Sequence, residues 1–197
     1  MKRSMLALAV LALSSSAGAQ AFVHPAKWSV TAPSEAKRGG VLREGLGFDR
    51  CEVAVVTNIG SGDHLGLNFI TSVEDLAVLK RVVVQNVSPS GYAVLNAADP
   101  MVTDMAPSCP GKVIFFAADR HHPLMATHRA QGKRTVYIDG LTLVAAEGSW
   151  VERIPLQGIP VTRGGTIGFQ VENVMAAVAA AWPALSPTPT MRPAAST

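Results

Sequence analysis

The stretch CEVAVVTNIGSGDHLG, residues 51–66, carries the strongest indication of fold in the chain. It opens with a continuous apolar run, Val53 to Val56, and not with an alternating one. Such a run predicts a strand covered on both faces, as in a parallel sheet. Gly60 and Gly62 follow and predict a flexible loop. Because open α/β sheets bind ligands at the carboxyl ends of their strands, this loop is the first place to expect a site.

The residues that follow alternate between helix-type and strand-type patterns. Ser72 and Asp75 predict a capping box for a helix over 73–87, which Pro89 and Gly91 would stop. The other expected elements are strands at 92–95 and 112–117, a short helix at 102–105, a hairpin over 134–144 around Asp139-Gly140, an extended segment at 167–170 and a helix over 171–182. This order predicts an α/β fold with a partly parallel sheet flanked by helices.

Composition narrows the functional classes. The chain has 197 residues with a formal net charge of +3, which fits one globular domain. It contains no block of like charges and no interleaving of basic and aromatic residues, so we expect no nucleic-acid partner. Cys51 and Cys109 lie far apart and have no metal-ligand spacing. They are interpreted as two reduced, partly buried thiols.

The two ends of the chain differ from its middle. Residues 1–21 combine a basic start, an apolar run from Met5 to Leu13 and the triplet Ala19-Gln20-Ala21, which is the pattern of a secretory signal peptide. The alternative is an Ala/Leu-rich helix of the fold itself. The apolar run is too short to span a bilayer as a helix, so we expect no membrane partner. Residues 183–197 are rich in Pro, Ser and Thr and predict a disordered tail.

Four stretches in unbroken order resemble one protein family. They read EAKRGGVLREGLGFDRC (35–51), VVTNIGSGDHLG (55–66), AVLNAADP (93–100) and FQVENVMAAVAAA (169–181). Together they resemble the Mur-ligase-like central domain of the cyanophycin synthetases. The resemblance implies three segments: a signal-like or remnant piece at 1–33, a partial central domain at 34–182 and the tail at 183–197.

The resemblance also implies a reaction. In this family ATP phosphorylates a carboxylate, and an amine then attacks the acyl phosphate to form an amide. The expected substrates are arginine and the aspartate side chains of a polymer, with ATP and Mg²⁺ as cofactors. A separate ATP-grasp domain of the family has no counterpart in this sequence. Because an exported ligase would find no ATP, the resemblance favours the cytoplasm over export.

Two residues match the family's metal ligands. His64 lies in the Asp63-His64-Leu65 segment, where the family's histidine helps to hold Mg²⁺. Glu35 precedes Arg-Gly-Gly, where the family has a metal-binding glutamate. This chain departs from the family's Glu-Thr-Ala-Arg order, and Pro33 makes the preceding strand doubtful. The alternative for His64 is a surface histidine beside an aspartate.

Three further residues are candidates by position. Lys80 resembles the lysine that several Mur ligases use in carbamylated form, and its alternative is a solvated helix lysine. Asn173 falls where the family's helix approaches adenine, and an amide can pair with that edge. Its alternative is a helix cap. Asn58 is a cofactor-side candidate, although Asn58 and Asp99 are interpreted first as residues that hold turns.

A cluster of histidines and arginines lies between the expected strand at 112–117 and the expected hairpin over 134–144. His121, His122 and His128 accompany Arg120 and Arg129. Without a carboxylate or cysteine pattern, a solvated loop and helix face is favoured over a metal site.

One family feature is missing from these residues. The sequence contains no G-x-x-x-x-G-K-[ST] loop to hold the phosphates of ATP. The first hypothesis is therefore a ligase fragment with little independent activity. The second is an exported, non-catalytic binding module on an α/β scaffold. The third is a subunit that completes its site with another chain that carries the phosphate loop.

Overall fold

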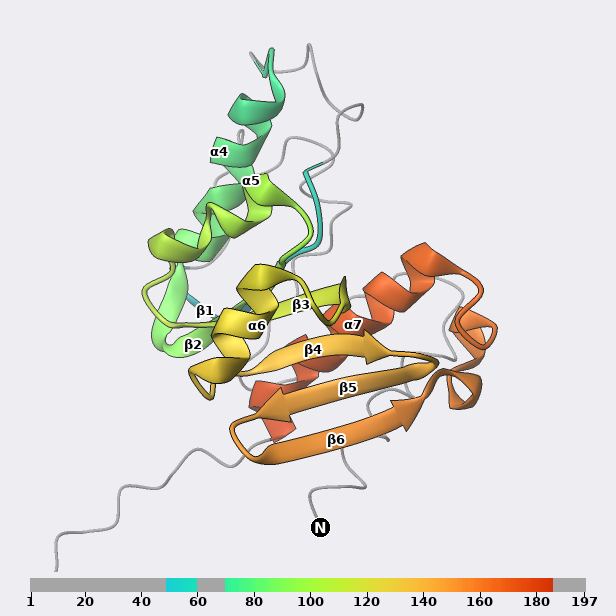
Figure 1. Ribbon diagram of the computed structural model, residues 1–197. Coiled ribbons are helices and arrows are strands. Elements are labelled where there is room, and N and C mark those ends of the chain that lie inside the picture. Colours follow the sequence, from blue (N-terminus) through green and yellow to red (C-terminus); the bar gives the residue numbers. More distant parts are fainter. Residues whose placement is uncertain (1–48, 60–69, 186–197) are drawn as a thin grey trace, which may run out of the picture.

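The computed structural model of the chain describes residues 49–59 and 70–185, which form a six-stranded sheet with helices on both faces (Figure 1). The strand order follows the sequence, β1-β2-β3-β4-β5-β6. The first four strands are parallel, and the last two join antiparallel. Their bounds are β1 (Cys51–Val56), β2 (Val87–Asn96), β3 (Lys112–Asp119), β4 (Thr135–Asp139), β5 (Thr142–Glu147) and β6 (Trp150–Pro155).

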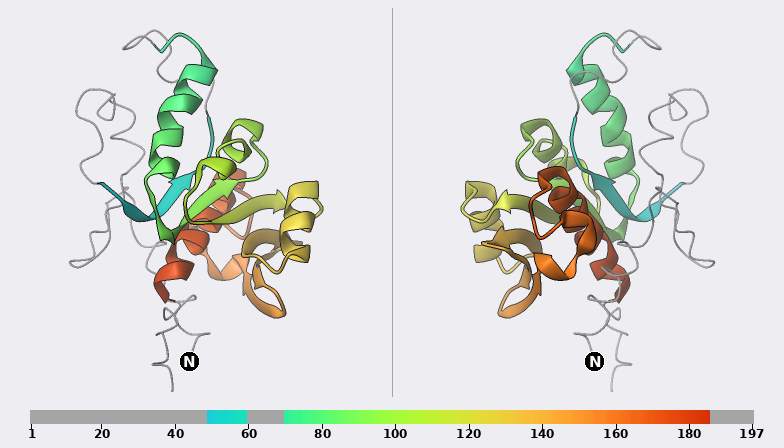
Figure 2. Two further views of the ribbon diagram at one scale, coloured as in Figure 1. Left: turned by 90° about the vertical axis from the view of Figure 1, so that its left-hand side faces the viewer. Right: turned by 90° about the vertical axis from the view of Figure 1, so that its right-hand side faces the viewer.

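The helices divide between the two faces of the sheet. The parallel crossovers carry α4 (Val73–Gln85), α5 (Pro100–Thr103) and α6 (Pro123–Ala130) on one face. The opposite face is covered by α7 (Gly168–Leu185), as Figure 2 shows. Three short 3₁₀ turns complete the described chain: η1 (Ala106–Ser108), η2 (Leu156–Gly158) and η3 (Pro160–Thr162). The expected α/β fold with a partly parallel sheet is confirmed.

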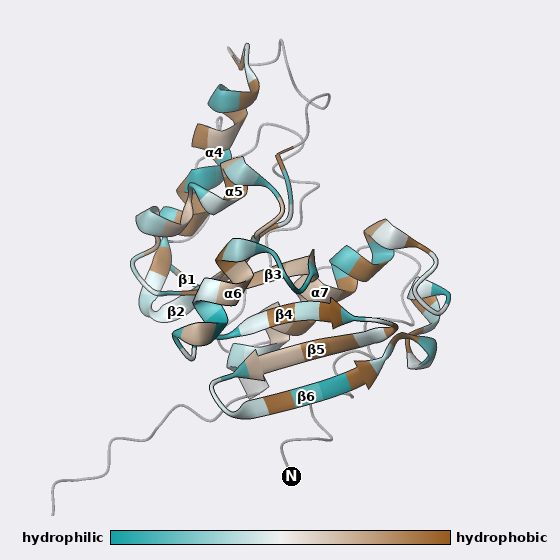
Figure 3. Cartoon of the chain, in the orientation of Figure 1, coloured by the Kyte–Doolittle hydropathy of each residue, from teal (hydrophilic) through white to brown (hydrophobic). Residues whose placement is uncertain are grey.

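Alternate residues of the central strands supply two separate cores. Leu95 and Phe115 pack under α4 to α6, whereas Val94, Ile114 and Phe116 pack under α7. Central strands buried on both faces read as continuous apolar runs, which is why β2 and β3 were visible in the sequence. The strands at the β6 edge of the sheet also differ in hydropathy. The strand β5 is largely hydrophobic, whereas β6 carries hydrophilic residues in its middle (Figure 3).

The strand β1 is less covered than its sequence predicts. Among the described strands it pairs only with β2, so it forms one edge of the sheet as far as the structure describes it. Ala54 and Val56 are buried, but Val55 is 39% exposed. The prediction of a strand at Val53–Val56 is confirmed, and the prediction of equal cover on both faces is wrong for Val55.

The capping box of α4 is confirmed in both directions. Ser72 Oγ accepts a hydrogen bond from Asp75 N at 3.1 Å, and Asp75 Oδ2 accepts one from Ser72 N at 3.0 Å. The helix ends at Gln85, however, and β2 already begins at Val87. The first part of β2 is irregular, because its register with β1 shifts between Val87 and Tyr92. Pro89 lies in that stretch, where a ladder hydrogen bond is not required of it.

The second half of the chain contains one confirmed turn and four differences. Gly140, with φ of 61°, closes the predicted hairpin between β4 and β5. The strand β6 and the helix α6 were not predicted as elements. The extended segment expected at 167–170 is wrong, because α7 begins at Gly168. That helix also runs through Pro183 to Leu185, beyond its expected end.

Candidate functional site

The carboxyl ends of β1 and β2 meet at one edge of the sheet, and Asp99 links them. Its Oδ1 accepts hydrogen bonds from Met101 N at 3.0 Å and Val102 N at 3.3 Å, which caps α5. Its Oδ2 accepts a hydrogen bond from Ile59 N at 2.8 Å, on the segment that leaves β1. One carboxylate therefore joins the end of β1 to the helix that follows β2, and its expected role in holding a turn is confirmed.

Two of the sequence-predicted site residues lie together at this edge. Lys80, half-buried on α4, donates a hydrogen bond from Nζ to the carbonyl oxygen of Asn58 at 2.9 Å. The exposed Asn58 side chain accepts a hydrogen bond from Thr57 Oγ1 at 3.1 Å. Asn58 thus contacts Lys80 through its backbone, and its amide remains at the surface of the edge.

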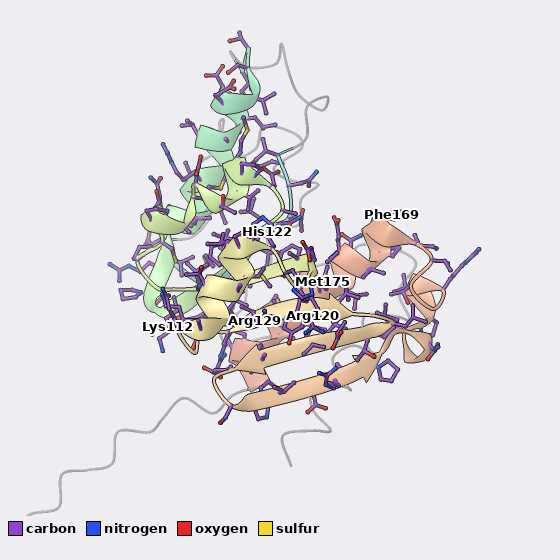
Figure 4. The ribbon with its side chains drawn as sticks, viewed as in Figure 1. Lys112, Arg120, His122, Arg129, Phe169 and Met175 are labelled. Carbon is purple, nitrogen blue, oxygen red and sulfur yellow. The ribbon has the colours of Figure 1, made fainter. Side chains whose placement is uncertain are left out.

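Asn173 lies on a different element. It is exposed on α7, where its Nδ2 donates to Gln170 Oε1 at 3.4 Å, within the helix. The start of α7, marked by Phe169 in Figure 4, lies on the side where β4 ends, and Met175 is buried against the sheet. The contact of Asn173 therefore stays within α7, whereas Lys80 and Asn58 meet at the end of β1. Glu35 and His64, the predicted metal ligands, lie outside the described residues.

A charged cluster occupies the carboxyl ends of β3 and β4. Asp139 accepts hydrogen bonds from Arg153 Nη1 at 3.1 Å and Arg120 Nη1 at 2.5 Å (Figure 4 labels Arg120). The hydrogen bonds from Arg153 and then Arg120 hold the pKa of Asp139 below its usual value. These groups are partly solvated, so the cluster contributes little to stability. It does place two guanidinium groups on the side of the sheet where the candidate site lies.

The histidines do not form one solvated face. His128 is only 5% exposed, and its Nε2–H donates to the carbonyl oxygen of Val113 at 3.0 Å. Its ring contacts Phe115 edge-on, at 4.9 Å between centroids. Burial is the main reason that the pKa of His128 is lowered from 6.5. The expectation of a solvated cluster is wrong for this residue, which lies under α6. Within the ranges that the structure describes, no three His, Cys, Asp or Glu side chains gather as a metal site.

Both cysteines are free thiols, as predicted. Cys51 is buried at the start of β1, and Cys109 is half-buried after η1. Burial, followed by the nearby Cys109, raises the pKa of Cys51 to about 11. Burial also raises the pKa of Cys109. Neither thiol has the depressed pKa that marks a nucleophile.

The matches to known proteins agree with this architecture. The Mur ligase middle-domain model matches residues 34–181. The chain belongs to the Mur ligase middle-domain family. Cyanophycin synthetase from Synechocystis sp. is 44% identical over 150 residues, which cover 75% of this chain and 17% of that protein. The enzyme of the same name from Geminocystis herdmanii is 42% identical over 150 residues, with the same shares of both chains.

Solved structures give a weaker likeness. A pseudomurein peptide ligase type C from Methanothermus fervidus matches with a TM-score of 0.45 and 17% identity, over 92% of this chain and 43% of that chain.

The chain spans only 17% of the length of its first curated relatives, which are named as synthetases. None of the helices in the described ranges is long and apolar enough to cross a bilayer.

Some site features had no signal in the sequence. The Lys80–Asn58 and Asp99–Ile59 contacts bridge 22 and 40 residues, respectively. The Asp99-Pro100 pair does predict a helix start, since Asp caps helices and Pro favours the first helical position. The further bond to Ile59 follows only from the parallel pairing of β1 and β2.

Proposed function

We propose that the chain is part of an ATP-dependent ligase of the cyanophycin synthetase type. In the proposed reaction, the γ-phosphoryl group of ATP is transferred to an aspartate side-chain carboxylate of a polymer, with release of ADP. The α-amine of arginine then attacks the acyl phosphate, loses a proton and displaces phosphate to leave an amide. The 44% identity over 150 residues to a cyanophycin synthetase carries this proposal.

The proposed roles of the residues follow their matches to the family's motifs. Glu35 and His64 would hold Mg²⁺, which prefers oxygen ligands and phosphates. The exposed amide of Asn173 is compatible with a contact to the adenine edge, because it offers both a donor and an acceptor. Asn58 would line the cofactor side. Lys80 keeps the role that the resemblance gives it, a metal ligand in carbamylated form, whose Nζ–H can still donate to the Asn58 carbonyl oxygen.

Nucleotide binding gives a direct test of the proposed adenine contact. We expect Mg²⁺-ATP to shift the backbone amide signals of the first turns of α7, and Asn173→Ala to reduce that shift. Glu172→Ala is the matched control, because this neighbour is also exposed on α7 and has no proposed contact with the nucleotide. Equal effects of the two substitutions, or no shift in the parent chain at any concentration, would count against the assigned role of Asn173.

We further propose that these 197 residues alone turn over little ATP. Backbone amides and a lysine around the phosphates supply much of the catalytic charge stabilisation in ATP-dependent enzymes, and the sequence has no such loop. The assay supplies aspartate polymer, labelled arginine and Mg²⁺-ATP, with and without a separate chain that carries a phosphate loop. Incorporation by this chain alone would contradict the fragment proposal. No incorporation in any combination would contradict the ligase proposal.

A cytoplasmic location follows from the need for ATP and is part of the proposal. The signal-like residues 1–21 favour the exported alternative, and intact mass separates the two. An uncut Met1 supports the cytoplasm, whereas cleavage after Ala21 supports export.

A further inference from the structure

A single peptide group at the carboxyl end of β1 is held at both ends by charged side chains. It joins Asn58 to Ile59. Its carbonyl oxygen accepts a hydrogen bond from Lys80 Nζ at 2.9 Å, and its N–H donates to Asp99 Oδ2 at 2.8 Å. The cation therefore lies at the negative end of the peptide dipole, and the carboxylate lies at the positive end.

The two holding residues are themselves anchored on separate elements. Lys80 projects from α4, whose start is secured by the capping box of Ser72 and Asp75. Asp99 is held by its own cap of α5, through the oxygen that Ile59 does not use. The peptide plane cannot rotate without breaking a charge-assisted hydrogen bond, and such bonds are stronger than neutral ones. The orientation in which the chain leaves β1 is thus set by two helices.

We propose that Lys80 and Asp99 act together as positioning residues, a peptide clamp that orients the 58–59 peptide at the edge where the proposed ATP site lies. Lys80 contributes to this clamp through its Nζ–H, which donates to the Asn58 carbonyl oxygen. The importance of the clamp for ligation rests on the proposed function, but the clamp itself does not.

Two substitutions remove a hydrogen bond to the 58–59 peptide and keep the other contacts of the substituted residue. Asp99→Asn keeps one oxygen for the cap of α5, since Asn caps helices as well as Asp, but it turns an NH₂ group toward Ile59 N–H. Lys80→Met keeps the apolar stem and removes the ammonium. Asp104→Asn and Lys133→Met are the controls, because both parent side chains are exposed and neither bonds to this peptide in the structure.

The measurement is amide hydrogen exchange of the full chain, resolved by NMR. Exchange at Ile59 is expected to become about tenfold faster or more in Asp99→Asn and in Lys80→Met, as for loss of a hydrogen bond to a charged group. The amides of Met101 and Val102 stay protected in Asp99→Asn, and Lys80→Arg restores slow exchange at Ile59. Unchanged exchange at Ile59 in both variants would overturn the clamp.

The same variants distinguish failure of the clamp from failure of the proposed function. The exchange experiment needs no substrate, so it stands whether or not the chain takes part in ligation. In an assembly that forms amides, Asp99→Asn is expected to lower kcat more than it raises KM for ATP, because it misorients the site without removing an ATP contact. Equal activity of Asp99→Asn and Asp104→Asn in that assembly would show that the clamp does not serve the reaction.

Discussion

Substitution of Gly111 by Ala tests the tightest backbone packing in the described fold. Gly111 directly precedes β3 and lies against the irregular first part of β2. A Cβ atom at Gly111 would lie 2.4 Å from the carbonyl oxygen of Gly91 and 2.6 Å from that of Ser88. Both contacts are with backbone atoms, so no side-chain rotation can relieve them. A Cβ atom at Gly91 would in turn lie 2.5 Å from the carbonyl oxygen of Glu52, so β1, β2 and the start of β3 approach one another closely at this end of the sheet.

The magnitude follows from two opposing effects. Overpacking of a well-packed site costs about 1–3 kcal/mol, and two backbone clashes place Gly111→Ala toward the upper end of that range. Ala also restricts the unfolded chain, which returns about 0.4–1 kcal/mol. The expected net loss is about 2 kcal/mol. For a chain of this size that corresponds to a fall in Tm of roughly 4–8 °C.

Urea denaturation and thermal unfolding measure this loss. Gly158→Ala is the control, because a Cβ atom there would meet nothing within 4 Å. The control variant is expected to match the parent or to be slightly more stable. If Gly111→Ala unfolded at the same urea concentration as Gly158→Ala, the close approach of β1, β2 and β3 at this end of the sheet would be wrong.

Two further predictions concern buried titratable groups. The pKa of His128 is lowered in the folded state, so as pH falls the unfolded chain takes up the proton before the folded chain does. The stability that neutral His128 contributes is therefore fully present above pH 6.5 and is lost as pH falls through the folded pKa. Urea denaturation at about pH 7.5 and about pH 5 should show this loss, and His128→Gln should reduce the difference between the two pH values. Cys51, with a pKa of about 11, should be nearly inert to iodoacetamide at roughly pH 8 in the folded Cys109→Ser variant and reactive in urea. Rapid labelling of the folded variant would mean that Cys51 is not buried.

Local sequence signals predicted the elements that depend on neighbouring residues. The capping box of Ser72 and Asp75 and the turn at Asp139-Gly140 act over two to four residues, and both appear in the structure. The strand β6 escaped prediction because its residues alternate between partial burial and exposure, with no fully buried position. Its inner side chains pack at the margin of the core, so their apolar pattern is weak.

The histidine cluster shows where linear proximity misleads. His121 and His122 precede α6, but His128 lies three residues after the buried Met125 and shares its face of the helix. Helical periodicity could have separated His128 from the other two histidines. Its partner Val113 could not have been predicted, because that contact depends on how α6 packs over β3.

The contacts at the carboxyl edge join residues that the sequence analysis treated separately. Asn58 and Lys80 were selected separately, one for the cofactor and one for catalysis, yet they share a hydrogen bond to one peptide group. The other end of that peptide binds Asp99, which was interpreted as a turn residue only. The Nζ–H of Lys80 can donate to this carbonyl oxygen in the ammonium form or in the carbamate form, so the contact fits both roles of Lys80. The exchange rate of the Ile59 amide tests whether Lys80 and Asp99 together orient the peptide.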